Sequence, residues 1–356
     1  MKIGIIGLPQ VGKKTLFQVL TGHEVNETAG PAKPIPGTAD LVDQRFDRLV
    51  AMYEPKKETR ARLDLVLLPK MEQEAIVRGD IFRDISDVDA LCHVVRAFED
   101  EAVYHAAGSV DPLRDVEMVG DELLLHDQVF LEKRIERLET AVKKVKDERQ
   151  QKELDLLKRL QAQLEGGAPL RLLTLSDEED LLIRSYPLIT RKEMVLVFNV
   201  GEDSLGDTSL LDRVADLCRD TGMEAMIVSA KVEAEIALLD SAEERQAFLQ
   251  DLGIEEPALQ VLARLCLKAL GRVSFFTVGK DEVHQWLVRV DSPAPVAAGV
   301  IHTDLQKGFI RAEVIKYDDL IAYGSEAELK KAGKLMVQGK DYIVVDGDIL
   351  NIRFNL

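Results

Sequence analysis

The residues best suited to chemistry form a glycine-rich segment near the N-terminus. Residues 7–13 read Gly-Leu-Pro-Gln-Val-Gly-Lys and match the GxxxxGK core of a phosphate-binding loop. The glycines let the backbone turn so that consecutive N–H groups point at phosphate oxygens, and the lysine places a positive charge beside the β and γ phosphates. A plain glycine-rich turn between a strand and a helix is the alternative interpretation. The nucleotide-binding residues predicted here are Gly7, Pro9, Gln10, Val11, Gly12, Lys13, Lys14 and Thr15.

The residue after Lys13 departs from this motif. The place is ordinarily held by Ser or Thr, whose hydroxyl binds Mg²⁺, whereas the ammonium of Lys14 cannot be a metal ligand. Two interpretations stay open: Lys14 replaces the metal electrostatically, or it points to solvent while the metal is held weakly. In both we expect hydrolysis to suffer, because the metal neutralises charge that develops in phosphoryl transfer. The catalytic residues stay unknown, since neither Gln nor His stands in a recognisable switch II position.

A second set of candidate residues follows two later strand-like runs. Residues 199–202 read Asn-Val-Gly-Glu, at the place where GTP-binding domains carry NKxD, whose Asp accepts hydrogen bonds from guanine. Val200 replaces the Lys and the longer Glu202 replaces the Asp, so we expect weakened guanine specificity. Residues 229–231 fit the Ser-Ala-Lys loop that packs beside the base. The predicted base-binding residues are Asn199, Val200, Glu202, Ser229, Ala230 and Lys231.

An alternation of strands and helices must position these loops. Lys2 to Gly7 is typical of a buried strand, and Lys13 to Leu20 has helical spacing, which together predict a βα unit around the phosphate loop. Strands that alternate with helices indicate a parallel α/β sheet. The further strand-like runs are Leu63 to Leu68, Ala90 to Val95, Met194 to Val200 and Ala225 to Val228.

A long helical insertion interrupts this alternation. Apolar residues recur at spacings of three and four on both sides of a polar stretch at residues 146–153, which predicts a helical hairpin with a narrow apolar seam. The sequence leaves open whether the arm is structural or binds a partner. The seam consists of Leu131, Ile135, Leu138, Val142 and Val145, then Leu157, Leu160 and Leu164, and the hairpin ends at Gly166, Gly167 and Pro169.

The last part of the chain differs again in character. After a helical stretch from Glu255 to Leu270, short β-rich segments are separated by Gly, Pro and Asp turns, which predicts a small β-grasp-like α+β domain. Its Trp286 is interpreted as a core residue. The strand-like segments are Ser274 to Val278, Gln285 to Val290, Phe309 to Ile315 and Tyr342 to Val345, and the candidate contact patch comprises His302, Lys307 and Arg311, which are alternatively ordinary solvated residues.

Composition limits the classes of partner. The formal net charge of the 356 residues is −17, which disfavours nucleic acid overall, and no DNA contact is expected. Residues 271–356, however, hold 11 Lys and Arg against 12 Asp and Glu, so an RNA contact would be local. No apolar stretch is long enough for a membrane span and no leader pattern is seen, so we expect a cytoplasmic protein. Cys92, Cys218 and Cys266 are far apart and interpreted as buried thiols.

Several segments resemble the YchF-type Obg-like ATPase family. GLPQVGKKTLF (Gly7 to Phe17) is similar to that family's GLPNVGKSTLF, HVVRAFED (His93 to Asp100) to its HVVRCFE segment, and NVGE to its NxxE specificity motif. The resemblance is strongest in HTDLQKGFIRAEVI (His302 to Ile315) and GKDYIVVDGDILNIRFN (Gly339 to Asn355), which are similar to its TGS domain.

The resemblance implies a domain plan and a function. It implies a P-loop NTPase G domain at residues 1–113 and 171–270, a coiled-coil arm at 114–170 and a TGS-like domain at 271–356. It also implies a preference for ATP, with GTP as the alternative, and association with ribosomes or RNA, or a role in stress control. Whether Mg²⁺ is needed stays open because of Lys14.

Three departures from the family affect γ-phosphate handling. The family's DxAG aligns with Asp64 to Leu67, which keeps the Asp and loses the Gly. Asp64 is therefore either a retained Mg²⁺-shell carboxylate or a strand-edge surface acid. The switch segment that follows, Pro69 to Asp80, contains only Gly79. The shortened switch I leaves Thr28 and Thr38 as candidates for its metal-binding threonine.

Three hypotheses follow from the sequence. The first is a divergent family member that binds nucleotide, prefers ATP, and has weak or lost hydrolysis. The second is a nucleotide-independent scaffold that binds RNA or protein through the TGS-like domain. The third is an active GTPase, favoured by the Ser-Ala-Lys loop and opposed by Glu202. His93 lies in an apolar run and is interpreted as a core histidine rather than a general base.

Overall fold

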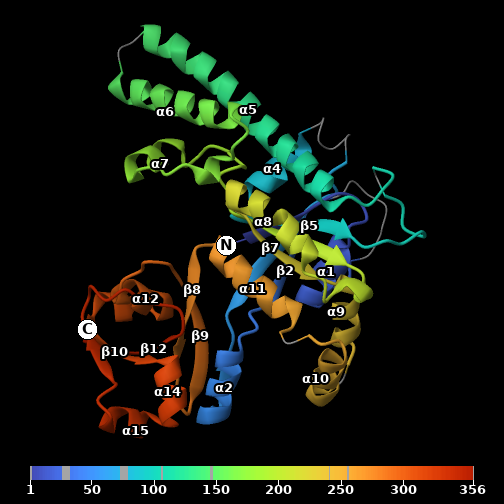
Figure 1. The fold of residues 1–356 in the computed structure, drawn as a ribbon. Coiled ribbons are helices and arrows are strands. Elements are labelled where there is room, and N and C mark those ends of the chain that lie inside the picture. The colour runs from blue at the N-terminus through green and yellow to red at the C-terminus, as the bar shows by residue number, and fades with distance from the viewer. Residues whose placement is uncertain are drawn as a thin grey trace. The chain divides into compact units, whose positions relative to one another are not determined.

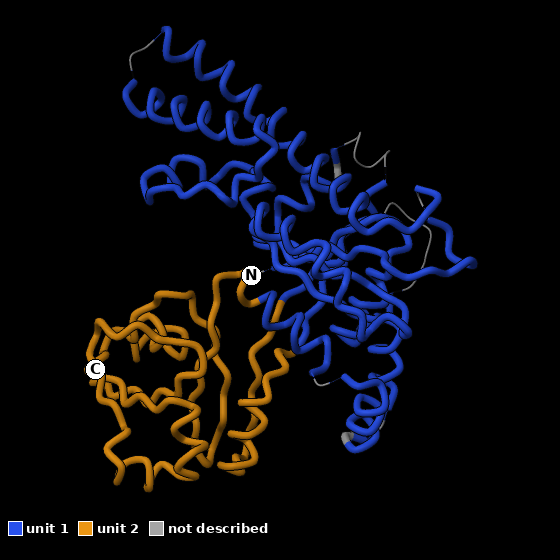
Figure 2. The backbone as a smooth tube through the Cα atoms, viewed as in Figure 1, with its two compact units in different colours: residues 1–39, 64–266 blue, residues 40–63, 267–356 orange. Residues whose placement is uncertain are grey.

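The computed structural model divides the chain into two compact units, which are coloured separately in Figure 2. Each unit consists of two separate stretches of sequence, so the chain passes from the first unit to the second and back before it enters the second again. Unit 1 comprises Met1–Ala39 and Asp64–Cys266, and unit 2 comprises Asp40–Leu63 and Leu267–Leu356. The structure describes residues 2–25, 33–72, 79–105, 107–144, 147–239, 241–254 and 256–355.

A six-stranded sheet forms the centre of unit 1. Its order is β2-β4-β1-β5-β6-β7, and β1 runs parallel to both β4 and β5, as β6 does to β5 and β7. The residues of β5 and β6 are almost all buried, as expected for central strands covered on both faces. The predicted α/β fold and its five strand runs are confirmed. The strands are β1 (Lys2–Ile6), β2 (Ile35–Asp40), β4 (Arg62–Leu67), β5 (Ala90–Ala97), β6 (Met194–Val200) and β7 (Glu224–Val228).

Helices connect and cover these strands (Figure 1). The first of them, α1 (Lys13–Thr21), ends at Gly22, whose φ of 67° provides the left-handed turn that terminates many helices. Among the described residues, no helix is both long and apolar enough to cross a bilayer. The others are α4 (Asp80–Ser86), α8 (Ser209–Thr221), α9 (Ala230–Ala237), α10 (Ala242–Asp251) and α11 (Ala258–Ala269), with 3₁₀ turns η1 (Leu170–Leu172) and η2 (Glu202–Ser204).

The helical arm projects from unit 1 as a layer of three helices (Figure 1). The predicted hairpin corresponds to α5 (Pro112–Lys144) and α6 (Glu148–Glu165), and α7 (Asp177–Ile183) packs against α6 as a third helix. The apolar seam is therefore wider than expected, and Val145 lies outside the described residues. Its core residues are Leu131, Ile135, Leu138, Leu154, Leu156, Leu157, Leu160, Leu164, Leu170, Ile183 and Leu188, with Val142 partly buried against them.

The stretch 146–153 is not simply a polar connection. The helix α6 already begins at Glu148, and Glu153 is buried within the arm. Its carboxylate accepts hydrogen bonds from the guanidinium of Arg134 at 2.7 and 3.1 Å and from the hydroxyl of Tyr186. The carboxylate thus joins α5, α6 and the segment after α7, because a buried charge requires such partners.

A buried aspartate fastens the arm to the sheet. Asp127 in α5 is fully buried and accepts hydrogen bonds from the backbone N–H groups of Ile189 and Thr190, at 2.9 and 2.7 Å, and from the Thr190 hydroxyl at 2.7 Å. These residues lie just before β6, the strand that carries Asn199 at its end. The long helix is therefore tied to the strand that positions the candidate base-binding residues.

A mixed six-stranded sheet forms unit 2, in the order β11-β10-β12-β8-β9-β3. One core cluster lies under α12 and includes Phe275 and Phe309; a second lies under α2, α14 and α15 and includes Phe46 and Phe276. The elements are α2 (Gln44–Tyr53), β3 (Lys57–Thr59), β8 (Arg272–Thr277), β9 (Glu282–Arg289), α12 (Ala294–Ile301), α13 (Thr303–Lys307), β10 (Phe309–Lys316), α14 (Tyr317–Tyr323), α15 (Glu326–Lys331), β11 (Met336–Gln338) and β12 (Asp348–Phe354).

Residues 40–63 pack with the C-terminal part of the chain, whereas the sequence placed them in the first part of the G domain. Asp43 caps α2 and pairs with Arg45, which also reaches Asp346 at 2.6 Å. The buried Gln285 of β9 donates to Asp43 at 3.3 Å, and β3 pairs with β9 in parallel. The assignment of residues 40–63 to the G domain is therefore corrected, because these contacts complete the sheet of unit 2.

The segment Tyr342 to Val345, which was predicted as strand-like, is an irregular loop with a single bridge at Ile343. The strand starts later, at Asp348, after Gly347 turns the chain with a φ of 85°. The fully buried carboxylate of Asp348 accepts hydrogen bonds from the Tyr342 hydroxyl at 2.8 Å and the Val345 N–H at 2.9 Å, which hold the loop in place of strand pairing.

The other side chains singled out in unit 2 are Trp286 and the three residues of the candidate contact patch. Trp286 packs against the first core cluster and donates to the Thr277 hydroxyl at 3.0 Å, which confirms its interpretation as a core residue. His302 accepts a hydrogen bond from the N–H of Asp304 at 3.2 Å, while Lys307 and Arg311 are exposed. Their role as a contact patch stays a prediction.

Candidate nucleotide-binding site

The phosphate loop lies between β1 and α1 and turns close against β5. Gly7 has a φ of 145°, and a Cβ atom there would lie 2.3 Å from the carbonyl oxygen of Val94. Gln10 and Gly12 also have positive φ angles, of 57° and 95°. No side chain caps α1, because its N-cap residue is Gly12. The first N–H groups of the helix are thus left for an anion, as in phosphate-binding loops.

Lys13 is buried at the start of α1, with 6% of its surface exposed. Its ammonium donates a hydrogen bond to the carbonyl of Gly7, which folds the side chain back over the loop. Burial lowers the pKa of Lys13 to about 7; the positive charge of Lys70 adds to this shift and the carboxylate of Glu72 opposes it. An anion bound at the loop would restore the charged form of Lys13, since opposite charge favours protonation.

Asn199 connects the phosphate loop to the predicted base loop. It is buried at the end of β6, and its side-chain amide donates to the Val11 carbonyl at 3.0 Å while its oxygen accepts the N–H of Ala230 at 2.9 Å. A Cβ atom on Gly12 would lie 2.1 Å from the Asn199 nitrogen, so only glycine fits there. Both loops are thereby held in one arrangement, a role that the sequence had not assigned to Asn199.

The remaining base-loop residues lie around this connection. Ser229 caps α9 by accepting the N–H of Val232 at 3.5 Å, and α9 packs beside α1. Glu202 and Lys231 are exposed, and Glu202 starts the turn η2 directly after the strand. The structure thus brings the two predicted loops together. Of the other predicted residues, Val11, Val200, Ser229 and Ala230 are buried, Pro9, Lys14 and Thr15 are half-buried, and Gln10 is exposed.

Asp64 does not lie at this site. It is exposed near the amino end of β4, level with Lys2 in the register, whereas the phosphate loop follows the carboxyl end of β1. Leu68, whose N–H donates to the Ile5 carbonyl, lies four positions after Asp64, which corresponds to about 13 Å along a strand. The interpretation as a metal-shell carboxylate is therefore wrong, and Asp64 is a strand-edge surface acid.

The loop after β4 lies against the phosphate loop instead. The N–H of Leu68 donates to the Ile5 carbonyl at 3.1 Å, and the N–H of Met71 donates to the Gly7 carbonyl at 3.3 Å. This loop carries Lys70, to which the sequence motifs assigned no role. The signal that could have found it is the register of β4 against β1, which sets the loop beside Gly7. Residues 73–78 of the predicted switch segment lie outside the described residues, and Gly79 is the N-cap of α4.

The residues described at this site do not fit a Mg²⁺ shell. Lys14 occupies the hydroxyl position and Asp64 lies at the other edge of the sheet. Thr38 is exposed on the edge strand β2, and Thr28 lies outside the described residues. Mg²⁺ requires oxygen ligands in a near-octahedral arrangement, and a lysine ammonium supplies none. The chemistry that these residues can support is therefore anion binding.

Two buried side chains of β5 support the site without lining it. His93 is level with Ile6, and burial, assisted by the charge of Lys13, lowers its pKa to about 3, in agreement with a neutral core histidine. Arg96 is fully buried, and its guanidinium stacks on the ring of Phe98. It donates at 3.1 to 3.3 Å to the carbonyls of Phe98, Asp100, Val103 and Tyr104, and so fixes the loop that follows β5.

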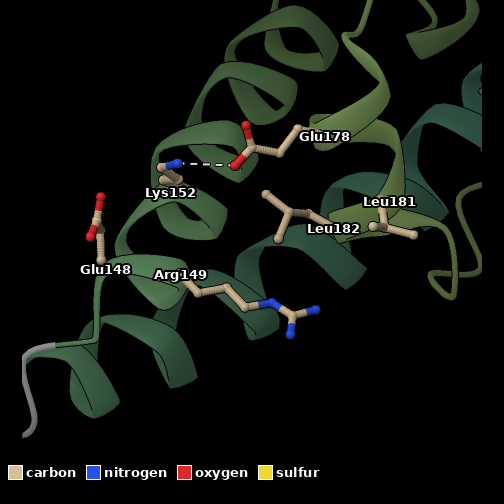
Figure 3. Close-up of a pocket in the computed structure, with 6 residues that line it drawn as sticks. All are labelled: Glu148, Arg149, Lys152, Glu178, Leu181 and Leu182. Atoms are coloured by element: carbon tan, nitrogen blue, oxygen red, sulfur yellow. Dashed lines mark hydrogen bonds and ion pairs between the residues drawn. The ribbon is translucent and has the colours of Figure 1, made fainter.

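A separate pocket lies in the arm (Figure 3). It is formed between α6 and α7, and Lys152 pairs across it with Glu178 at 2.9 Å. It shares no residue with the phosphate loop. The residues that line it are Glu148, Arg149, Lys152, Glu178, Leu181 and Leu182.

The cysteines are all free thiols. Cys92 and Cys266 are buried, as interpreted from the sequence, while Cys218 is half-buried. Burial raises the pKa of Cys266 to about 12, which keeps it protonated and unreactive.

Comparison with known proteins places the chain in a family. Residues 273–355 match the model YchF-GTPase_C, described as "Protein of unknown function (DUF933)". The chain is 38% identical to "Ribosome-binding ATPase YchF" of Bacillus subtilis over 99% of both chains, and 39% identical to the protein of the same name from Haemophilus influenzae over 100% of this chain and 99% of the relative. It is 37% identical to "Obg-like ATPase 1" of Caenorhabditis elegans, over 100% of this chain and 92% of the relative.

A solved structure agrees with this result. "Structure of the Schizosaccharomyces pombe YchF GTPase" superposes with a TM-score of 0.82 at 29% identity and covers 99% of this chain and 97% of that one. The family predicted from the sequence motifs is thus confirmed by matches along the whole chain and by the fold. With its phosphate loop, its NxxE segment and its C-terminal domain in the family's order, the chain belongs to the YchF family of Obg-like ATPases.

Proposed function

We propose that this chain binds a nucleoside triphosphate at the phosphate loop, prefers ATP to GTP, and hydrolyses it slowly or not at all. The observation that supports this most directly is the position of Asn199. Its two hydrogen bonds, to Val11 and from Ala230, join the predicted phosphate-binding loop to the predicted base-binding loop. The two segments that one nucleotide would have to contact are therefore held side by side.

The preference for ATP is argued from the base loop. Guanine is recognised by a short carboxylate that accepts from two of its N–H groups, together with an aliphatic lysine stem that covers the base. Here Val200 is buried and Glu202 is exposed and longer by one methylene, so neither contribution is available in the usual form. The relatives in Bacillus subtilis and Caenorhabditis elegans are named ATPases, which supports the same preference.

The loss of hydrolysis is argued from the metal position. Phosphoryl transfer requires charge neutralisation on the γ phosphate, which Mg²⁺ normally provides. Lys14 and the displaced Asp64 remove two of its customary ligands. His93 is buried and its pKa is lowered to about 3, so it is too weak and too inaccessible to serve as the base. We therefore expect a binding protein that signals by occupancy rather than by rapid turnover.

Ribosome association is proposed from the relatives and from the arm. The relatives in Bacillus subtilis and Haemophilus influenzae are named ribosome-binding. In this chain the helical arm and unit 2, which we propose to be a coiled-coil arm and a TGS-like domain, are the candidate contact surfaces. The proposed G domain is the sheet of unit 1.

Titration tests the nucleotide part of the proposal. The purified full-length chain is titrated with ATP and with GTP, each with Mg²⁺ and with EDTA, and phosphate release is measured on the same samples. We expect ATP to bind more tightly than GTP and phosphate release to be slow. The absence of binding by both nucleotides would favour the scaffold hypothesis, and rapid Mg²⁺-dependent turnover of GTP would favour the active GTPase.

Cosedimentation with ribosomes tests the partner part. Isolated ribosomes are mixed with the chain with and without ATP and pelleted through sucrose. We expect binding that depends on ATP, and a variant shortened to remove residues 131–160, which form the distal part of the arm, should bind less. Equal pelleting of the shortened chain would assign the contact to another surface.

A further inference from the structure

We propose that Lys70, on the loop after β4, is a third cation of the phosphate site, and that Lys70 and Lys14 together take the place of the divalent metal. The site would then bind the triphosphate in its metal-free form. This inference rests on the proposed nucleotide binding and names the form of the ligand. It assigns a role to a residue of the predicted switch segment that the sequence had not singled out.

The backbone places Lys70 beside the phosphate loop. The N–H of Leu68 donates to the carbonyl of Ile5 in β1 at 3.1 Å, and the N–H of Met71 donates to the carbonyl of Gly7 in the phosphate loop at 3.3 Å. Lys70 lies between these two donors in the sequence. The two bonds fix the path of this short segment against Ile5 and Gly7. Lys70 is exposed, so its flexible stem can carry the ammonium over the loop toward a bound phosphate.

Electrostatics shows that Lys70 acts on the centre of the site. Its charge reaches the buried Lys13, whose pKa it helps to lower, although the dominant cause of that shift is burial. Glu72 on the same loop opposes the effect, and His93, which the charge of Lys13 also reaches, is held neutral by burial. Two like charges placed so close are unfavourable in the empty site, and a polyanion between them would remove the cost.

The charges of Lys14 and Lys70 can take the place of a divalent cation. In a metal-dependent site one lysine and one divalent cation face the β and γ phosphates. Here Lys14 stands at the position of one metal ligand, Asp64 lies near the other end of its strand, and the loop after β4 brings the charge of Lys70 near Lys13. Lys14 and Lys70 together carry two positive charges, as Mg²⁺ does, and Glu72 on the loop of Lys70 offsets part of that charge.

A comparison of the affinities for ATP and for ADP tests whether Lys70 contacts the γ phosphate. Affinities of the full-length chain and of Lys70→Gln are measured by calorimetry for both nucleotides in EDTA. A hydrogen bond between charged groups corresponds to roughly a tenfold change in affinity, so Lys70→Gln should bind ATP about tenfold more weakly and ADP almost as before. Lys2→Gln makes the same change of charge at the opposite edge of the sheet, where Lys2 is exposed, and should bind both nucleotides as the unchanged chain does.

ATP binding with and without Mg²⁺ tests whether Lys14 and Lys70 take the place of the metal. The unchanged chain should bind ATP equally in EDTA and in Mg²⁺. Lys14→Ser restores the usual hydroxyl and should bind ATP more weakly in EDTA and regain affinity when Mg²⁺ is added. Thermal unfolding of each variant checks that it is folded, which is expected because Lys70 is exposed and Lys14 is half-buried.

The outcomes separate the two proposals. If the unchanged chain binds neither nucleotide in any condition, nucleotide binding fails and this inference fails with it. If the unchanged chain binds ATP only with Mg²⁺, or if Lys70→Gln weakens ATP and ADP equally or neither, nucleotide binding stands and the role of Lys70 is refuted.

Discussion

Replacement of Asn199 by Ala is the sharpest test of how the site is assembled. The substitution removes one donor and one acceptor, and leaves the Val11 carbonyl and the Ala230 N–H without partners in a buried region. Each of the two unpaired buried groups costs about 1 to 3 kcal/mol, so the free energy of unfolding of unit 1 should fall by about 2 to 6 kcal/mol. A shift of roughly 5 to 20 °C in the unfolding midpoint follows for a domain of this size.

The same substitution should also weaken nucleotide binding. Because Asn199 holds the phosphate loop against the base loop, its loss leaves each free to move, and nucleotide binding must then order both. We expect at least a tenfold loss of ATP affinity, corresponding to about 1.4 kcal/mol. Differential scanning fluorimetry with and without ATP measures both quantities, since the stabilisation by a ligand grows with the logarithm of its concentration divided by Kd.

A matched control is available in unit 2. Asn351 is exposed and makes a single side-chain hydrogen bond, to Glu313 at 3.2 Å. Asn351→Ala should change stability by less than about 0.5 kcal/mol and leave ATP affinity unchanged. If Asn199→Ala unfolds within 2 °C of the unchanged chain, a margin of roughly 1 kcal/mol, and binds ATP equally well, the proposed connection between the loops is refuted.

Three other perturbations should change ATP affinity or stability in a direction that the structure determines. ATP affinity should fall above pH 7, by up to tenfold per pH unit, because the pKa of Lys13 is about 7 in the empty site and the phosphates need the ammonium form; constant affinity between pH 7 and 9 in calorimetry would contradict this. The free energy of unfolding should fall by up to about 1.4 kcal/mol per pH unit below pH 6.5, since burial lowers the pKa of His93 to about 3 and the unfolded state therefore takes up the proton first. His93→Gln should flatten this pH dependence in urea unfolding. Asp348→Ala should destabilise unit 2 by about 2 kcal/mol, because Lys316, 2.6 Å away and only partly exposed, loses its partner, while ATP affinity stays unchanged in the same titration.

Local patterns in the sequence predicted the parts of the fold whose signal is complete within a few residues. The strands β5 and β6 are buried on both faces and therefore read as largely apolar runs, and the phosphate loop is defined by glycines that its backbone angles require. The arm was predicted from its helical periodicity. The family motifs then gave the order of the domains.

What the sequence missed depends on pairing over long distances. Asp64 was aligned by its residue type, but its register with Lys2 places it near the amino end of β4, away from the phosphate loop. The strand β3, Lys57–Thr59, is three residues long and polar, so nothing local shows that it completes the sheet of unit 2. No motif singles out Lys70. Its position beside the phosphate loop follows from the backbone hydrogen bonds of Leu68 and Met71.

The division of unit 2 into two stretches has a consequence for biosynthesis. Residues 40–63 leave the ribosome about 200 residues before the strands with which they pack. At about 5 to 20 residues per second this segment waits roughly 10 to 40 s for its partners. During that time α2 has no cover for Phe46 and Leu49, both fully buried in the finished protein. Unit 1 therefore has to fold while residues 40–63, which interrupt its sequence, are still without their packing partners. Expression of residues 271–356 alone would produce a sheet that lacks its edge strand β3.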